Sequence, residues 1–172
     1  MVPCLLGHLN RSWFRFWWRW LPVACLPLIV AIPAHAVSWE AIDVLRNKLT
    51  RSGVRVVQKD CTRRGLQGLY HPSSDTLVVC RSHRSPAQVW DTLAHEATHR
   101  MQHCAGGPIS DPMHHRAMYS ALARSHPAEV RSIRVYPRQQ QLAELEARYT
   151  AKLPPRDVLR LFDRYCGAQV RV

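Results

Sequence analysis

Apolar residues recur at every fourth position between residues 85 and 104, which is the spacing of a helix that buries one face. They are Val89, Leu93, Ala97 and Met101. The segment starts with Ser85, Pro86 and Gln88, which suit the N-cap, the first helical position and the third position of a capping box. It is followed by Ala105-Gly106-Gly107-Pro108, a sequence typical of a helix end. We therefore predict a helix over residues 85–104.

The same predicted helix carries a second face that is polar. Its members are Gln88, Asp91, Thr92, His95, His99 and Gln102. This face is too polar for a packed core, so we interpret it as the floor of a cleft. A solvated helix face that happens to carry two histidines is the alternative interpretation.

The segments before this helix predict one further helix and a small sheet. Residues 38–51 have helical spacing, and the predicted buried face consists of Trp39, Ile42, Leu45 and Leu49. Residues that favour β-structure predict strands over 54–61, 65–70 and 76–80, and the last two flank a turn rich in proline and serine. We expect these strands to form a small antiparallel sheet.

The segments after residue 110 predict only helices. Asp111 and Pro112 suit the cap and the first residue of one helix, and a short helix is expected over 127–135. Residues 139–153 have a strongly helical composition and end at two prolines, and a last helix is expected over 158–166. This order of elements predicts an α+β fold in which a small sheet packs on the central helix, within one domain over 37–172.

Residues 1–36 have the composition of a signal peptide. Arginines precede the apolar stretch 21–33, and Ala34-His35-Ala36 is a small-x-small sequence of the type that signal peptidase cleaves. The apolar stretch is shorter than the roughly 20 residues of a membrane-spanning helix, and prolines interrupt it. We predict cleavage after Ala36 and a secreted or periplasmic protein. An uncleaved leader would instead anchor the protein to a membrane.

The cysteines that remain after such cleavage predict two disulfides. They are Cys61, Cys80, Cys104 and Cys166. An even number in an exported chain indicates disulfides, whereas a reducing compartment would keep the thiols free. Three pairings are open, and we prefer Cys61 with Cys80 across a hairpin and Cys104 with Cys166 at the ends of two helices. Because no C-x-x-C spacing occurs, we expect no structural zinc cage.

The chain is strongly basic, with 24 lysines and arginines against 12 acidic residues and a net charge of +12. Loss of residues 1–36 would remove three arginines and no acid, leaving a net charge of +9. Such a charge favours acidic partners, among them nucleic acid, anionic polysaccharide and lipid headgroups. Because the basic residues are scattered, we expect contact with an anionic surface at most, no specific nucleic-acid site, and a monomeric protein.

The segment His95-Glu96-Ala97-Thr98-His99 is an H-E-x-x-H sequence within the predicted helix. At a spacing of four, the two histidine side chains lie about 40° apart around a helix, so both can reach one metal ion. Glu96 lies on a neighbouring flank, where it can take a proton from a water molecule at that metal. A catalytic zinc usually has three protein ligands and one open position, so another segment has to supply the third ligand.

Glu144 and Glu146 are the candidates for this third ligand. Together with His95 to His99, the segment Glu144 to Ala147 resembles the gluzincin metallopeptidases, in which H-E-x-x-H is followed downstream by a glutamate and, three positions later, an alanine. The resemblance implies a minimal zincin-like fold, bound Zn²⁺ and peptidase activity. We prefer Glu144, because it shares a face with the small residues Ala147 and Ala151 that would let its helix pack closely against the metal helix. Glu146, which lies on a bulkier face, is the alternative.

The chain departs from the gluzincin pattern at one position. Many gluzincins have an acidic or amide residue four positions after the glutamate, and Arg148 stands there in this chain. We therefore expect Asp91 or Gln102 to orient a zinc-bound histidine. The metzincin pattern fails, because Ala105 occupies the position of its third histidine. Other candidates for the third ligand are Asp111, His114 and His115.

The sequence as a whole predicts a zinc peptidase that acts on a peptide or protein substrate. Glu96 would take a proton from the attacking water and pass it to the leaving amine, and an edge strand would align the peptide. The candidates for the donor that stabilises the oxyanion are Tyr119, His114, His115 and Tyr136. The alternative function is an inactive zincin-like protein that is secreted, basic and binds anionic partners.

Overall fold

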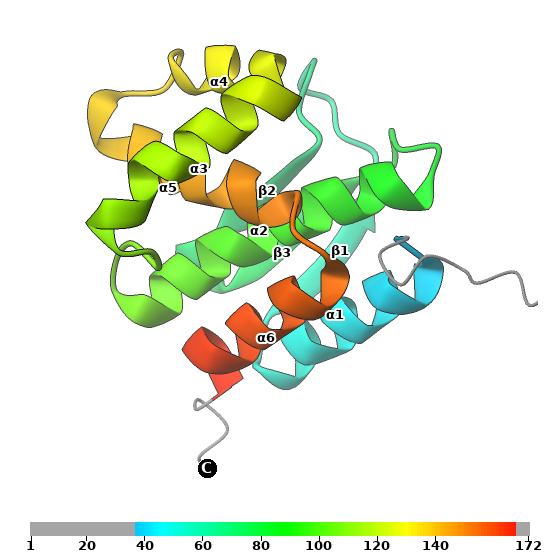
Figure 1. The fold of residues 1–172 in the computed structure, drawn as a ribbon. Helices are drawn as coiled ribbons and strands as arrows, with labels where there is room; N and C mark the ends of the chain where they lie inside the picture. The colour runs from blue at the N-terminus through cyan, green and yellow to red at the C-terminus, as the bar shows by residue number, and fades with distance from the viewer. Residues whose placement is uncertain (1–36, 168–172) are drawn as a thin grey trace, which may run out of the picture. The chain divides into compact units, whose positions relative to one another are not determined.

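Residues 37–167 are described by a computed structural model, and Figure 1 shows their arrangement. Along these residues the elements are α1 (Trp39–Arg51), β1 (Arg55–Lys59), β2 (Gly68–His71), β3 (Thr76–Cys80), α2 (Pro86–Ala105), α3 (Pro112–Ser125), α4 (Pro127–Ile133), α5 (Arg138–Ala151) and α6 (Pro155–Cys166). This is the mixed α+β content that the sequence predicted. The predicted leader and its cleavage site lie outside the described residues.

The sheet is mixed, with the strand order β1-β3-β2. β2 and β3 are antiparallel, as predicted, and pair Tyr70 with Leu77. β1 runs parallel to β3 and pairs Val56 with the same Leu77, so the prediction of a wholly antiparallel sheet is wrong. The physical reason is burial, because every residue of β3 is buried and this apolar strand therefore takes the central position. The segment between β1 and β2 is long enough to cross over β3.

The central helix α2 packs on the sheet and contacts most of the other helices. In Figure 1, α1 and α6 lie on one side of α2, and α3, α4 and α5 lie on the other. The predicted apolar face of α2 is confirmed, since Leu93, Ala97 and Met101 have no exposed surface. α1 buries its predicted residues except Trp39, which is 58% exposed because it is the first residue of the helix, at the margin of the core.

The ends of α2 follow the local sequence. The Ser85 hydroxyl accepts a hydrogen bond from the Gln88 amide at 3.4 Å, which is one half of the predicted capping box. The Gln88 side chain accepts from the Arg84 amide at 2.8 Å instead of the Ser85 amide. Gly106 ends the helix with a φ of 71°, a left-handed conformation that glycine adopts without strain.

The helices α3, α4 and α5 enclose a second, smaller core. Its buried residues are Met118, Leu122, Val130, Ile133 and Leu145. Asp111 caps α3 as predicted, by accepting a hydrogen bond from the Met113 amide at 2.9 Å. This core holds α5 beside α2, and these two helices carry the candidate ligands.

Both predicted disulfides are present, Cys61–Cys80 and Cys104–Cys166. The first follows the end of β1 and joins it to β3, so it links two parallel strands instead of spanning a hairpin. The second joins the ends of α2 and α6. Within the part of the chain that the structure describes, no helix is both long and apolar enough to cross a membrane.

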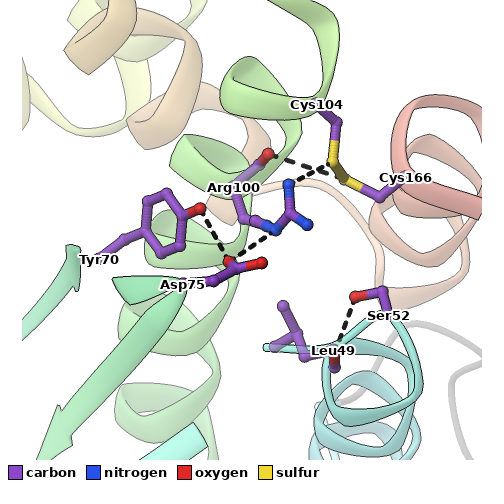
Figure 2. The surroundings of a disulfide bond; sticks show 7 residues. All are labelled: Leu49, Ser52, Tyr70, Asp75, Arg100, Cys104 and Cys166. Carbon is purple, nitrogen blue, oxygen red and sulfur yellow. Dashed lines mark hydrogen bonds and ion pairs between the residues drawn. A yellow bond between two sulfur atoms is a disulfide. The ribbon is translucent and has the colours of Figure 1, made fainter. Parts of the chain in front are cut away.

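A buried arginine links this second disulfide to the sheet (Figure 2). Arg100 is 7% exposed, and its guanidinium donates to Cys104 Sγ at 2.9 Å. The same group forms an ion pair with Asp75 at 2.8 Å, and the Tyr70 hydroxyl donates to that carboxylate at 2.9 Å. Because Tyr70 lies on β2, this network fixes β2 against the end of α2.

Candidate metal centre

Three side chains that are far apart in the sequence meet between α2 and α5. His95 Nε2 and His99 Nε2 are 3.2 Å apart, and the Glu144 carboxylate lies 3.6 Å from the first and 3.4 Å from the second. A tetrahedral zinc ion with bonds of about 2.0–2.1 Å separates its ligand atoms by roughly 3.3–3.4 Å. The three side chains therefore form a group that could hold one metal ion.

The close approach of α5 to α2 depends on small residues beside Glu144. Ala147 has no exposed surface and Ala151 is 5% exposed, and both follow Glu144 on the side of α5 that packs against α2. Larger side chains there would hold the two helices apart. The sequence interpretation of this face as a close-packing surface agrees with the structure.

The charges of the three side chains depend on one another. Burial and, to a lesser degree, the charge of His99 lower the pKa of His95 to about 3, so this imidazole is neutral and keeps a lone pair. Burial also acts to lower the pKa of His99, but the contacts with Glu144 and the charge of Glu96 raise it overall. Burial acts to raise the pKa of Glu144, but both histidines lower it overall. Glu144 Oε2 is buried and has no hydrogen-bond partner among the described residues, so this oxygen is available to act as a ligand atom.

Gln102 orients one of the histidines. Its side-chain nitrogen donates to the Ala143 carbonyl at 3.0 Å and to Glu146 at 2.9 Å, so its oxygen faces His99 Nδ1, at 2.9 Å. Nδ1 of His99 therefore carries the proton, and Nε2 is left free to bind a metal. Asp91, the other residue expected in this role, instead forms an ion pair with Lys152 at 2.6 Å.

Glu146 does not reach the two histidines. It has no exposed surface, and its carboxyl group accepts hydrogen bonds from Ser110 N at 2.8 Å, Ile109 N at 3.1 Å and the Ser110 hydroxyl at 2.5 Å. Together with the bond from Gln102, these contacts occupy both carboxyl oxygens. Glu146 therefore tethers the loop between α2 and α3 to α5. Glu144 is the candidate glutamate that the structure brings to the histidines.

Glu96 lies beside the three candidate ligands and is 7% exposed. Its pKa is raised to about 7, mainly by burial, while the charge of His99 partly offsets this rise and that of Glu144 adds to it. A carboxyl group with such a pKa can both accept and release a proton near neutral pH.

Gly68 on β2 allows the sheet to approach Glu96, and the sequence analysis did not single it out. A Cβ atom at this position would lie 2.5 Å from Thr92 Cγ2 and 3.0 Å from both Glu96 Cγ and the Val78 carbonyl. Only glycine fits without displacing α2. The signal available in the sequence was a glycine inside the strand predicted over residues 65–70.

Two adjoining hollows form a cleft along this site. The polar pocket, of about 320 Å³, is lined by His95, Glu96 and residues of α4 and α5. The open groove, of about 940 Å³, is lined by all three candidate ligands, by β2 and by the segment between α4 and α5. The predicted polar face of α2 forms their floor, with contributions from Asp91, Thr92, His95, His99 and Gln102.

The other candidates from the sequence lie in different surroundings. Tyr136 lines both hollows, as do His95 and Glu96. His114 and Tyr119 are exposed on α3, and His115 Nε2 lies 4.0 Å from Glu146. Of the candidate oxyanion donors, Tyr136 is therefore the one that the structure brings to the cleft. Asp111 caps α3, and neither Asp111 nor His115 joins the group of ligand atoms.

Arg148 and Lys152 extend the site into the polar pocket. Arg148 Nη2 lies 3.6 Å from Glu144 Oε2, and its other nitrogen pairs with Glu129. Lys152 pairs with Asp91 and, at 3.2 Å, with Glu129. Although burial acts to raise the pKa of Glu129, these two cations lower it overall. The polar pocket therefore contains cations that are already paired with carboxylates.

The arrangement can hold a divalent cation and exchange a proton beside it, within a cleft that is open to a ligand. These are properties of the residues of this chain. No protein-family model, curated protein or solved structure matches the chain.

Proposed function

We propose that the protein is a zinc-dependent peptidase with a minimal zincin-like fold. The observation that carries the proposal is the convergence of His95, His99 and Glu144, with Glu96 buried beside them in an open cleft. Two imidazoles and one carboxylate are a ligand set that suits zinc, whereas calcium and magnesium prefer oxygen ligands alone. The H-E-x-x-H sequence and the downstream glutamate, which resemble the gluzincins, support the same assignment.

Zinc bound by these residues would polarise a peptide carbonyl and make a water molecule more acidic. Glu96 is placed to take the proton from this water as its oxygen forms a bond to the carbonyl carbon. Glu96 then passes the proton to the amide nitrogen as the carbon–nitrogen bond breaks, so the products are a carboxylic acid and an amine. The Tyr136 hydroxyl is the candidate donor to the oxygen that becomes negatively charged.

We also propose that the protein works after export to an oxidising compartment. The two disulfides support this, because such bonds persist mainly outside the cytosol. The composition of residues 1–36 adds to the argument.

Metal analysis beside an assay of hydrolysis tests the peptidase. Protein purified after expression of the full chain should contain about one zinc per molecule and cleave a denatured protein. Glu96→Gln should keep the zinc and lower the rate of cleavage by about a thousandfold or more, because it removes the base and not a ligand. Glu144→Ala should lose the zinc, and Glu146→Gln should keep it.

Two results would contradict the proposal. One is wild-type protein that takes up no zinc, and the other is cleavage that Glu96→Gln leaves unchanged. Metal-free protein without hydrolysis would favour the alternative, an inactive basic protein that binds anionic partners, which the net charge of +12 supports.

A further inference from the structure

The two hollows of the cleft differ in how their cations are paired. In the polar pocket, Arg148 and Lys152 are matched by Glu129 and Asp91. The open groove is lined by Arg63 and Arg64, and the acidic residues among its lining are Glu96 and Glu144 of the site itself. Among the ion pairs of the described residues, none includes Arg63 or Arg64. The open groove therefore presents positive charge that is free for a ligand.

The two arginines lie on a loop that is held at both ends by one residue of the sheet. We call residues 62–66 the arginine loop. The disulfide from Cys61 anchors its start to Cys80, and the Cys80 amide donates to the Gln67 carbonyl at 2.8 Å and so anchors its end. Within the loop, the Leu66 amide donates to the Arg63 carbonyl at 3.2 Å. These restraints hold the arginines at the groove and lower the entropy lost when they bind a ligand.

The open groove also has two apolar margins. Leu69 on β2 is 39% exposed, and Val135, between α4 and α5, is 81% exposed. Both line the groove. A ligand made only of sugars and anionic groups would leave these side chains in water, whereas a peptide with apolar and acidic residues would cover them and pair with the arginines.

We propose that the open groove binds an extended peptide rich in acidic residues, with acidic side chains at Arg63 and Arg64 and apolar side chains against Leu69 and Val135. The peptide would lie along β2, which is an edge strand of the sheet and can offer its backbone groups. The statement that this peptide is the substrate rests on the proposed peptidase function. The binding itself does not require hydrolysis.

The test measures binding in the Glu96→Gln background, so that the probe is not consumed. The probes are two fluorescein-labelled peptides, one of alternating Glu and Leu and one of alternating Lys and Leu, and binding is followed by fluorescence anisotropy at constant salt. The variant R63E/R64E is compared with R116E/R124E, which changes the net charge equally at exposed arginines of α3 outside the groove lining. A third variant, L69S/V135S, removes the apolar margins.

The Glu/Leu peptide should bind more tightly than the Lys/Leu peptide. R63E/R64E should weaken its binding by about tenfold or more, and R116E/R124E by less than about twofold, because exposed charge pairs act over short distances. L69S/V135S should weaken the binding of this peptide and leave the binding of heparin unchanged.

Equal losses in the two arginine variants would overturn the proposal, since they would indicate a general attraction to the basic protein. Heparin that binds as tightly as the Glu/Leu peptide and loses as much in R63E/R64E would also overturn it, in favour of a polyanion site. Binding of the Glu/Leu peptide as expected, in a protein whose wild type hydrolyses nothing, would support the groove assignment and contradict the peptidase.

Discussion

Two glutamates of α5, separated by one residue, lie in opposite chemical surroundings. Glu146 faces the loop between α2 and α3 and accepts hydrogen bonds from two backbone amides, a hydroxyl and a side-chain amide. Glu144 faces the cleft, where its carboxylate lies 3.4 Å from His99, 3.6 Å from His95 and 3.6 Å from the Arg148 guanidinium. Both are buried, at 0% and 7% exposure, so burial alone does not distinguish them.

The difference shows which kind of buried acid points to a ligand. A carboxyl group that is surrounded by donors is satisfied by the protein and contributes to the fold. At Glu144 the neighbours include two nitrogens that can themselves act as electron-pair donors, and one carboxylate oxygen has no hydrogen-bond partner among the described residues. Such a convergence of electron-rich atoms is stable when a cation or a proton lies between them.

The largest predicted effect is a difference in stability between variants of the two glutamates. Glu146→Ala should lower the free energy of unfolding by about 4 kcal/mol, because it leaves the buried Gln102 amide and the half-buried amides of Ile109 and Ser110 without their acceptor. Glu144→Ala should cost much less in metal-free protein. Urea unfolding of both variants in the presence of a chelator provides the measurement, and equal losses would show that the two sites do not differ in this way.

The pH dependence of stability tests the third buried acid, Glu96. Its pKa in the folded protein is raised to about 7, so the folded state binds a proton more tightly than the unfolded state, whose pKa is near 4.5. The contribution of Glu96 to the free energy of unfolding of the metal-free protein, measured relative to Glu96→Gln, is therefore greatest below pH 4.5. This difference should decrease by about 3 kcal/mol as the pH rises from 4.5 through 7. Unfolding of the two proteins at several pH values measures this, and a constant difference would contradict it.

The link between the two glutamate sites is Gln102, which contacts both His99 and Glu146. Gln102→Ala should weaken zinc binding by about 10- to 100-fold, because the imidazole loses the group that fixes its orientation and tautomer. Competition with a chromophoric chelator measures the zinc affinity. Asp91→Ala is the matched control, since Asp91 lies on the same helix face but its carboxylate pairs with Lys152 and not with a histidine, and an equal loss in both variants would remove Gln102 from this role.

The smallest predicted effect sharpens the description of the Glu146 site. Ser110→Ala should lower the free energy of unfolding by about 1 kcal/mol, because one donor is lost while Glu146 Oε1 keeps the backbone amides of Ile109 and Ser110 as partners. Thermal unfolding followed by circular dichroism is sensitive enough for this change. A loss as large as that of Glu146→Ala would show that the hydroxyl, and not the backbone amides, determines the stability of the loop.

Much of the fold could be predicted from local patterns. The helix α2, its capping serine and its buried stripe follow from residues within a few turns of each other, and both disulfides match the preferred pairing of the cysteines. The direction of β1 could not be predicted in this way, because pairing between strands depends on which strand is most completely buried. The exposed position of Trp39 similarly depends on where the core ends.

The sequence by itself determined the spacing of His95, Glu96 and His99, because four residues make about one turn of any α-helix. Only the tertiary structure decided which glutamate joins them, since this depends on the rotation and approach of α5 relative to α2, which small residues and a distant loop control. The arginine loop and the apolar margins of the groove were also beyond the sequence, because they meet through contacts between segments that no local pattern relates.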